Sequence, residues 1–505
     1  MAAKSPLMEQ YKSIKNEHKD AFLFYRLGDF YELFYDDAVT VSHELELTLT
    51  GKNAGPEGRV PMCGIPYHAA ETYIYRLVQK GYKVAICEQL EDPKKAKGLV
   101  KRDVIRIVTP GTILFENSIA DKSNNYLAYL YETDNDIDAV LADISTGECW
   151  WGIWDKKKER EAFFDMLSVY APTEAVCSLS DNFYGRLEAY CRARLGGCLL
   201  TRRGEEGDYP VPHVAEALGD ENIRCVFAWL AAYLKEMMKA DAAEFHTVMP
   251  IREEDCLLLG EDCLRNLEIT RNMRDGGRRG TLLEILDHTH TAMGARLLRR
   301  WLERPLTDVN RIIQRQDGIE ELTGHTTELS QLEEMLEHVF DFERILTRIE
   351  ANTTSPKDLL ALKASLGMIP EIKKLLSGTV SIVLRKLSDQ MDIHSTVYEL
   401  LDRSMNENGT GNIRDGKYIK EGYSAELDEV RSLSENSRKW IADLEEREKE
   451  KTGIKLKIGF NNVFGYYFEI TNANKVPIPE YYMRKQTLVN AERYITPELK
   501  EFETK

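Results

Sequence analysis

The stretch FLFYRLGDFYELFYDDA, residues 22–38, sets the character of the first part of the chain. Aromatic and β-prone residues on both sides of Gly28 and Asp29 predict a strand, a tight turn, a second strand and the start of a helix. Side chains two positions apart in a strand lie on the same face. We therefore expect the ring of Phe30 and the carboxylate of Glu32 to reach one target together.

Phe30 and Glu32 suggest a specific chemistry. A phenylalanine ring can wedge between stacked bases and kink a duplex, at the lowest cost where base pairing is already weak. A carboxylate beside the ring is repelled by phosphates and is tolerated only where it accepts a hydrogen bond from a base edge. The commoner alternative is an aromatic-rich core strand with a surface glutamate, and the residues alone do not exclude it.

The composition of the whole chain is that of a globular protein. Its 505 residues suffice for about three or four domains. The composition, with 43% hydrophobic and 30% charged residues, is too hydrophobic for a disordered chain and excludes disorder over most of the length. The longest apolar run, Val226 to Leu234, is shorter than the roughly 20 residues of a membrane helix. The N-terminus has no signal region, and nine cysteines without a C-x-x-C spacing indicate reduced thiols, so we expect a cytosolic protein.

Changes in composition along the chain predict four domains. Residues 1–115 have the pattern of a mixed α/β domain, and residues 120–245 alternate strand-like and helical runs. Leucine, glutamate and arginine at helical spacing dominate residues 255–422. Residues 423–505 begin with a long exposed helix that should end near Gly453 and continue into a β-rich module. The predicted fold class is therefore multidomain α+β.

Charge is distributed unevenly. The 84 acidic and 67 basic side chains give a formal net charge of −17, which taken alone speaks against a polyanionic partner. Residues 80–106 reverse this locally with eight basic against four acidic side chains, and residues 451–494 do so with seven against three. In the second segment aromatic residues are interleaved, which suits a surface that offers cations to phosphates. An ordinary solvated face fits this composition equally well.

Motifs for nucleotide and metal chemistry are absent or weak. The sequence contains no G-x-x-x-x-G-K-[ST] phosphate loop, and the glycines at 409, 411 and 416 fit a turn. His288 and His290 stand two positions apart in a helical pattern, where side chains point in divergent directions. We expect two ordinary polar helix residues there.

Three carboxylates in the second predicted domain allow an enzymatic alternative. Asp138, Asp143 and Glu148 fall on or beside the strand-like segment DAVLADISTGE. Paired carboxylates there could hold two magnesium ions for phosphodiester cleavage. Acidic residues that bound a strand are more often turn and cap groups.

Blocks of sequence spread along the whole chain resemble one known family, in that family's order. RLGDFYELFYDDA (26–38) resembles the family's Phe-x-Glu mismatch motif. Three further blocks resemble the rest of the family's first domain: PMCGIPYHA (61–69), AICEQ (85–89) and RIVTPGT (106–112). ADISTGE (142–148) is similar to the connector and LDHTHTAMGARLLRRWLERPL (286–306) to the helical core. The lever and clamp are resembled by IRDGKYIKEGYSAELDE (413–429), FGYYFEIT (464–471) and RKQTLVNAERYITPELKEFE (484–503). The family is MutS, the bacterial DNA mismatch-recognition proteins.

The resemblance implies a mismatch-binding domain, an RNase H-like α/β connector, an α-helical core and lever, and a β-rich clamp that closes over the duplex. Phe30 would stack at the mispair, and Glu32 would hydrogen-bond a mispaired base. On the same basis, Arg484, Lys485, Asn490 and Arg493 would contact the DNA backbone, and Lys101 and Arg102 of the basic segment 80–106 are further candidates.

Full-length members of the family continue into an ATPase domain, which uses ATP and magnesium and supplies the main homodimer contact, and they act with the partner MutL. No phosphate loop occurs here, and the final ELKEFETK has neither a helix cap nor a breaker. We therefore expect an N-terminal fragment that is not an enzyme by itself and holds no cofactor or metal. It would bind double-stranded DNA with mismatches or small loops, in the cytoplasm and associated with the nucleoid, with no membrane partner.

Two alternatives from other functional classes remain. The first is a metal-dependent nuclease centred on Asp143, which the resemblance weakens because the family's connector is RNase H-like without being a nuclease. The second is a helical scaffold that binds proteins and makes no use of Phe30.

Overall fold

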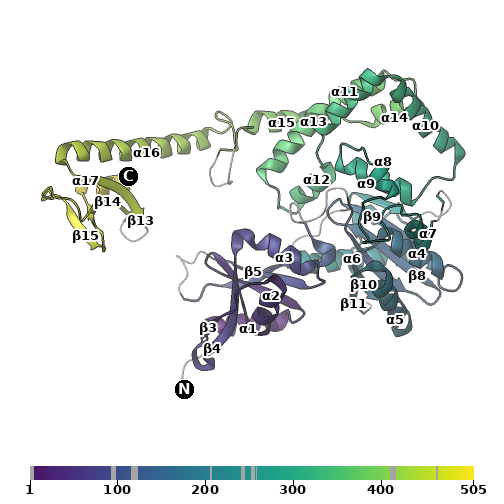
Figure 1. Ribbon diagram of the computed structural model, residues 1–505, viewed down its shortest axis with the longest axis horizontal. Coiled ribbons are helices and arrows are strands. Elements are labelled where there is room, and N and C mark those ends of the chain that lie inside the picture. The colour runs from purple at the N-terminus through teal and green to yellow at the C-terminus, as the bar shows by residue number, and fades with distance from the viewer. Residues whose placement is uncertain are drawn as a thin grey trace. The chain divides into compact units, whose positions relative to one another are not determined.

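The computed structural model describes residues 5–91, 98–114, 123–204, 207–239, 245–251, 256–257, 259–409, 417–461 and 465–504. The chain divides into two compact units, Met1–Asp402 and Arg403–Lys505 (Figure 1). The predicted boundaries near 115, 245 and 422 do not coincide with this division, and the four-domain organisation stays a prediction.

A six-stranded sheet forms the first part of unit 1. Its strands are β1 (Ala21–Leu27), β2 (Phe30–Phe34), β3 (Thr50–Asn53), β4 (Arg59–Pro66), β5 (Lys83–Gln89) and β6 (Arg102–Val108). They lie in the order β3-β4-β2-β1-β5-β6, with β1 and β5 parallel and the other neighbours antiparallel. The strand, turn, strand and helix start predicted for residues 22–38 are confirmed.

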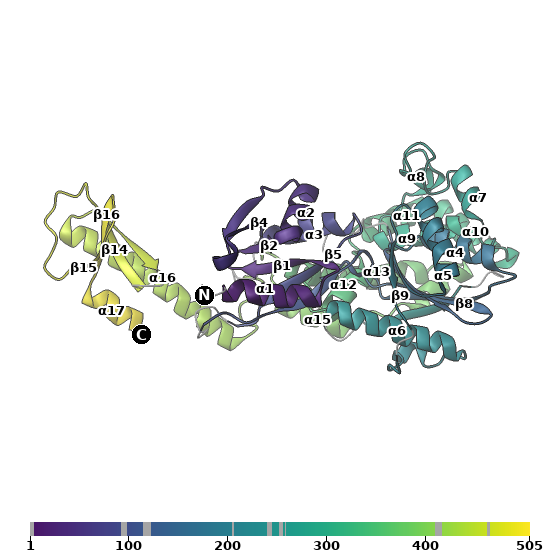
Figure 2. The same cartoon turned by 90° about the horizontal axis from the view of Figure 1, so that it is seen from below.

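Helices cover both faces of this sheet. Figure 2 shows α1 (Pro6–Glu17) on one side, and α2 (Tyr35–Leu45) and α3 (Ala70–Val78) on the other. Alternate residues of β2 divide between the two layers, as period-two geometry requires: Leu33 belongs to the core beneath α2 and α3, and Phe34 to the core beneath α1. Each face of the strand therefore has its own packing partners.

A second six-stranded sheet follows, in the order β11-β10-β7-β8-β9-β12. Its strands are β7 (Tyr126–Glu132), β8 (Asp136–Asp143), β9 (Glu148–Asp155), β10 (Glu174–Ser178), β11 (Leu199–Arg202) and β12 (Thr247–Pro250). Strands β7 to β9 are antiparallel, whereas β10 runs parallel to β7 and β11 to β10. The helices of this part are α4 (Arg160–Tyr170), α5 (Asp181–Tyr190) and α6 (Glu221–Met238). Helix α6 contacts both β8 and β6, so it packs against both sheets.

The rest of unit 1 is helical, as the leucine spacing predicted. Its helices are α7 (Glu261–Asn266), α8 (Leu282–Leu286), α9 (Ala292–Glu303), α10 (Val309–Gly324), α11 (Thr326–Glu337), α12 (Phe342–Glu350), α13 (Pro356–Ser377), α14 (Ile382–Gln390) and α15 (Ser395–Ser404), which ends just beyond the division between the units. The expectation that His288 and His290 lie on a helix is wrong. They lie between α8 and α9, because Asp287 accepts hydrogen bonds from Thr289 and the Thr291 hydroxyl caps α9.

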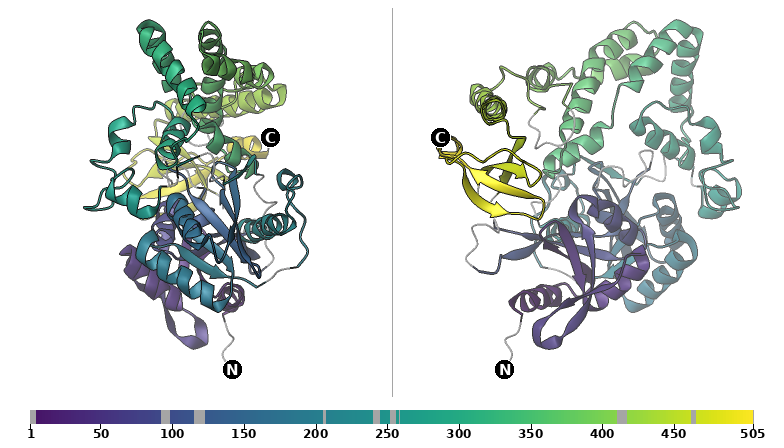
Figure 3. Two further views of the ribbon diagram at one scale, coloured as in Figure 1. Left: turned by 90° about the vertical axis from the view of Figure 1, so that its right-hand side faces the viewer. Right: turned by 60° about the vertical axis from the view of Figure 1, so that its left-hand side comes forward.

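Unit 2 consists of a long helix and a small sheet. Helix α16 (Ala425–Thr452) begins at the N-cap Ser424 and ends at Gly453, where φ is +69°. The predicted end of this helix is therefore confirmed. Strands β13 (Leu456–Asn461), β14 (Gly465–Thr471), β15 (Met483–Thr487) and β16 (Ala491–Ile495) form an antiparallel sheet in the order β13-β14-β16-β15, followed by α17 (Pro497–Thr504). Figure 3 shows this sheet in yellow.

Over the described residues, no helix is both long enough and apolar enough to cross a membrane.

Candidate nucleic-acid interface

The β1–β2 hairpin presents Phe30 at the first position after a two-residue turn. Leu27 pairs with Phe30, so Gly28 and Asp29 alone make the connection, and Gly28 adopts φ +59°. A glycine meets this backbone requirement without strain. Behind the turn, Arg26 Nε donates to the Gly28 carbonyl over 2.5 Å, and its guanidinium lies 3.8 Å from the Tyr67 ring centroid. The turn is thus braced from the β4 side of the sheet.

The Phe30 ring is exposed because α1 covers only part of its face of the sheet. Tyr11 of α1 packs edge-to-face on Phe34 with ring centroids 5.0 Å apart, and Phe34 is completely buried. Phe30 lies four residues earlier on the same face and keeps 46% of its surface exposed. The interpretation of Phe30 as a core residue is therefore wrong, since a core ring would be buried.

Glu32 lies between these two rings on the same face, as the period-two argument predicted. Its Oε2 forms an ion pair with Lys52 Nζ on β3 at 2.5 Å. Gly64 of β4 pairs directly with Glu32 of β2. A Cβ at Gly64 would lie 3.7 Å from Phe30 Cδ1 and 3.8 Å from Glu32 Cγ. The absence of a side chain at Gly64 therefore keeps the sheet surface beside Phe30 and Glu32 open.

Sequence reasoning missed Lys52. Its position beside Glu32 follows from the strand order β3-β4-β2, which no local pattern specifies. The alternation of side chains along β3 could have assigned Lys52 to a face, but not to a neighbour.

The basic segment 80–106 offers fewer accessible cations for DNA phosphates than its charge suggested. Lys101 is exposed, and its backbone N–H donates to Glu91 Oε1 over 2.7 Å. Arg102 is only 7% exposed: its Nε donates to the Arg26 carbonyl over 2.8 Å, and its Nη1 donates to the Val100 carbonyl over 3.0 Å. The Arg102 guanidinium is therefore buried against these carbonyl groups and does not face solvent. The prediction that Arg102 contacts a DNA phosphate is wrong, because such a contact requires an accessible guanidinium. Lys94, Lys95 and Lys97 lie outside the described residues.

The four residues of unit 2 that we predicted to contact the DNA backbone lie on or beside β15 and β16. Arg484 Nη1 donates to Glu492 over 3.0 Å, and Arg493 donates from Nε to Glu469 over 3.1 Å. Lys485 is exposed at the irregularity of pairing between Arg484 and Gln486, and Asn490 is exposed in the turn that leads into β16. Lys485 and Asn490 thus offer the more accessible polar groups, since both arginines already hold carboxylates.

The carboxylates of the nuclease alternative are engaged within the protein. Asp143 is fully buried and accepts hydrogen bonds from Asn124, Asn125 and Ser145. Glu148 binds Arg300 Nη2 with both carboxylate oxygens, at 2.6 and 2.8 Å. Among the described residues, no group of three histidine, cysteine or acidic side chains has the arrangement of a metal site. The geometry therefore fits a structural role for both carboxylates better than metal binding.

Asp138 differs from these two residues. It is 1% exposed, and within the described part of the chain its Oδ2 has no hydrogen-bond partner. Burial, aided by the negative charges of Asp220 and Asp136, raises the pKa of Asp138 to about 7. Burial of this carboxyl without a hydrogen-bond partner for Oδ2 therefore disfavours its ionised form in the folded chain.

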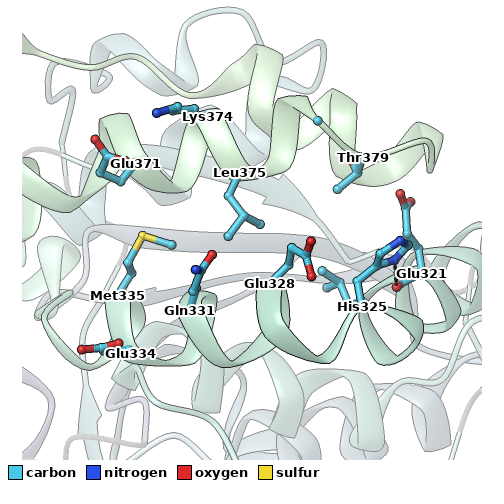
Figure 4. Close-up of a pocket in the computed structure, with 12 residues that line it drawn as sticks. Glu321, His325, Glu328, Gln331, Glu334, Met335, Glu371, Lys374, Leu375 and Thr379 are labelled. Atoms are coloured by element: carbon cyan, nitrogen blue, oxygen red, sulfur yellow. Dashed lines mark hydrogen bonds between the residues drawn. The ribbon is translucent and has the colours of Figure 1, made fainter.

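A cavity of 640 Å³ in the helical region is separate from all of these residues. In Figure 4, α11 and α13 face each other across it, with Leu375 pointing into the space between them. Four glutamates and one lysine are among its lining residues: Glu321, Glu328, Glu334, Glu371 and Lys374. An acidic lining repels phosphates, so we place no DNA contact there.

Comparison with known proteins agrees with the motifs. Residues 5–117 match MutS domain I, residues 262–459 match MutS domain III, and residues 422–505 match MutS family domain IV. The matched domain I contains the hairpin with Phe30 and Glu32, and the matched domain IV contains the small sheet of unit 2.

Curated relatives extend the similarity to the entire chain. The chain is 43% identical over 509 residues to the DNA mismatch repair protein MutS of Caldanaerobacter subterraneus subsp. tengcongensis. This match covers 99% of the chain and 59% of that protein. The MutS proteins of Bacillus subtilis and Acetivibrio thermocellus are 42% and 40% identical, with 100% of this chain and 58% and 59% of the relatives covered. The chain spans about three-fifths of the length of these relatives. Three matched domains in one order, together with similarity along its entire length, show that the chain belongs to the MutS family.

Proposed function

We propose that this chain reads duplex DNA for mispaired bases and small loops in mismatch repair. The observation that carries the proposal is an exposed phenylalanine ring beside a partnered carboxylate on one open sheet face. The ring supplies a wedge for a base step that unstacks cheaply, and the carboxylate accepts a hydrogen bond from a base that is no longer paired. An intact duplex offers neither, since its bases stay stacked and its phosphates repel the carboxylate.

Within this proposal, Phe30 and Glu32 contact the mispair, whereas Lys101, Arg484, Lys485, Asn490 and Arg493 are candidates for the DNA backbone. Contacts to phosphates hold a protein on the duplex without reading its sequence. Arg484 and Arg493 would have to exchange their carboxylate partners for phosphates. Arg102 is left out because its guanidinium is buried.

A whole protein of this family would couple recognition to ATP and magnesium, form a homodimer and pass the signal to MutL, in the cytoplasm close to the nucleoid. The 505 residues contain no G-x-x-x-x-G-K-[ST] loop to hold a triphosphate, so no residue described above fits ATP and we assign no catalytic step to them.

The test is a fluorescence anisotropy titration at one stated salt concentration, with a duplex that carries a single G·T mispair and with its fully paired twin. The wild-type chain should prefer the mispaired duplex, and Phe30→Ala should remove the preference. Phe340→Ala is the matched control, because Phe340 is equally exposed at 47% but lies in the helical region. Equal binding of both duplexes by the wild-type chain would overturn the proposal.

A further inference from the structure

Lys52 is a charged group that contacts Glu32 beside Phe30 and has no role in the proposed function. It lies on β3, with β4 between it and β2. Its Nζ reaches Glu32 Oε2 at 2.5 Å and lies 5.6 Å from the centroid of the Phe34 ring. The ammonium group is therefore held by a carboxylate and an aromatic face at once, which restricts its conformations.

Both partners of this ion pair are partly buried. The Lys52 side chain is 35% exposed and that of Glu32 is 17% exposed. The pair thus differs from the exposed surface pair Lys12–Glu57, in which each side chain is 44% exposed. Exposed ion pairs contribute little to stability because water and salt screen the attraction between their charges. A partly buried pair is screened less, so its two side chains are held together more firmly.

The pairing leaves one oxygen of Glu32 available. Lys52 occupies Oε2, and no donor within the described residues hydrogen-bonds Oε1. A glutamate side chain alone would sample several rotamers, and its charge would be repelled by approaching phosphates. With Lys52 in place, the carboxylate has a fixed direction, and its Oε1 can still accept a hydrogen bond.

We propose that Lys52 is a positioning residue for mispair recognition: it orients the Glu32 carboxylate beside Phe30. The inference rests on the proposed function, since it assigns Lys52 a role in that same site. It distinguishes an indirect role, which acts through Glu32, from a direct contact between Lys52 and a phosphate.

Four variants of the 505-residue chain test the assignment by anisotropy with the same two duplexes: Lys52→Met, Lys52→Arg, Glu32→Ala and the Lys52→Met/Glu32→Ala double variant. Lys52→Met should reduce the ratio of the two dissociation constants by roughly 3- to 10-fold, within the lower part of the range for coupled neighbours. Lys52→Arg should restore most of it, because arginine keeps the charge and the carboxylate contact. In the Glu32→Ala background, Lys52→Met should reduce the ratio no further.

Lys12→Met is the matched control, since it removes one positive charge and one ion pair from the same part of the chain without touching Glu32. It should leave the ratio unchanged. A thermal melt of each variant verifies that it is folded.

Three outcomes overturn the inference. If Lys52→Met weakens binding of both duplexes equally and leaves their ratio intact, Lys52 acts as a phosphate contact. If it lowers the ratio as much without Glu32 as with it, Lys52 acts independently of that carboxylate. If the wild-type chain shows no preference at all, the proposed function fails first, and the role of Lys52 fails with it.

Discussion

Phe30 leaves nearly half of its ring in solvent, so its position contributes little to the stability of the fold. Substitutions at exposed sites usually change the free energy of unfolding by less than about 0.5 kcal/mol. We predict that Phe30→Ala keeps the wild-type melting temperature to within about 1 °C while it removes the mispair preference. Differential scanning calorimetry measures the first quantity and anisotropy the second. A large drop in melting temperature would mean that the ring has a packing role after all.

Asp138 should make unit 1 less stable as the pH rises. Its pKa is raised from 3.8 to about 7 in the folded chain, so the folded state favours the protonated carboxyl. Between about pH 4 and pH 7 the unfolded chain ionises this group while the folded chain resists, and stability is lost progressively across that window. Below pH 4 both states are protonated, and the full contribution is present.

The corresponding prediction concerns Asp138→Asn, which removes the ionisation and keeps the shape. At pH 8 the variant should melt about 1 °C or more above the wild type, roughly the effect of 1 kcal/mol in a unit of about 400 residues. At pH 4.5 the difference should shrink or reverse. Melting curves at five pH values test this, and parallel curves for the two proteins would contradict it.

At the scale of elements, the β1–β2 hairpin depends on the backbone of Gly28. A Cβ at Gly28 would meet no atom within 4 Å, so the cost of a side chain there is conformational. We predict that Gly28→Ala destabilises unit 1 by about 1 kcal/mol, the typical penalty of the left-handed region for an L-residue. Urea unfolding measures this difference.

Gly185 provides the control for that experiment. It lies inside α5, and a Cβ there would also meet no atom within 4 Å. Gly185→Ala should stabilise the chain by about 0.5–1 kcal/mol, because alanine restricts the unfolded chain and favours the helix. Opposite signs for the two variants would show that backbone conformation and not free space decides the outcome. Equal signs would show that Gly28 has no special role.

At the scale of the whole molecule, the proposed function requires that an acidic chain with a net charge of −17 contact DNA through local basic groups. We predict that Lys485→Met weakens binding of paired and mispaired duplex equally. The slope of log K against log salt should fall by about 1, the value for one lost phosphate contact. Lys158→Met, at an 84% exposed site elsewhere, removes the same charge and should leave the slope unchanged. A change in the mispair preference itself would contradict a pure backbone role for Lys485.

Much of this organisation could be predicted from local sequence, and the failures have two physical causes. Period-two alternation around the Gly28 turn correctly placed Phe30 and Glu32 on one face, because a strand's geometry is local. The inward guanidinium of Arg102 and the ion pair of Lys52 depend on which elements become neighbours in the sheet, which no short window specifies. The break between α8 and α9 at His288 depends on the Asp287 side chain competing with the helix backbone. Local patterns therefore did not specify side-chain partners across elements, nor the side chains that compete with a helix backbone.

The two-residue turn between Leu27 and Phe30 also limits how the chain can change in length. A strand has a side-chain period of two, so one inserted residue moves every following side chain to the opposite face unless a bulge absorbs it. Here an uncompensated insertion would bring Tyr31 to the open surface and bury Glu32 among apolar groups. We therefore expect the number of residues from Gly28 to Phe30 to be kept more strictly among relatives than the identity of Asp29 between them.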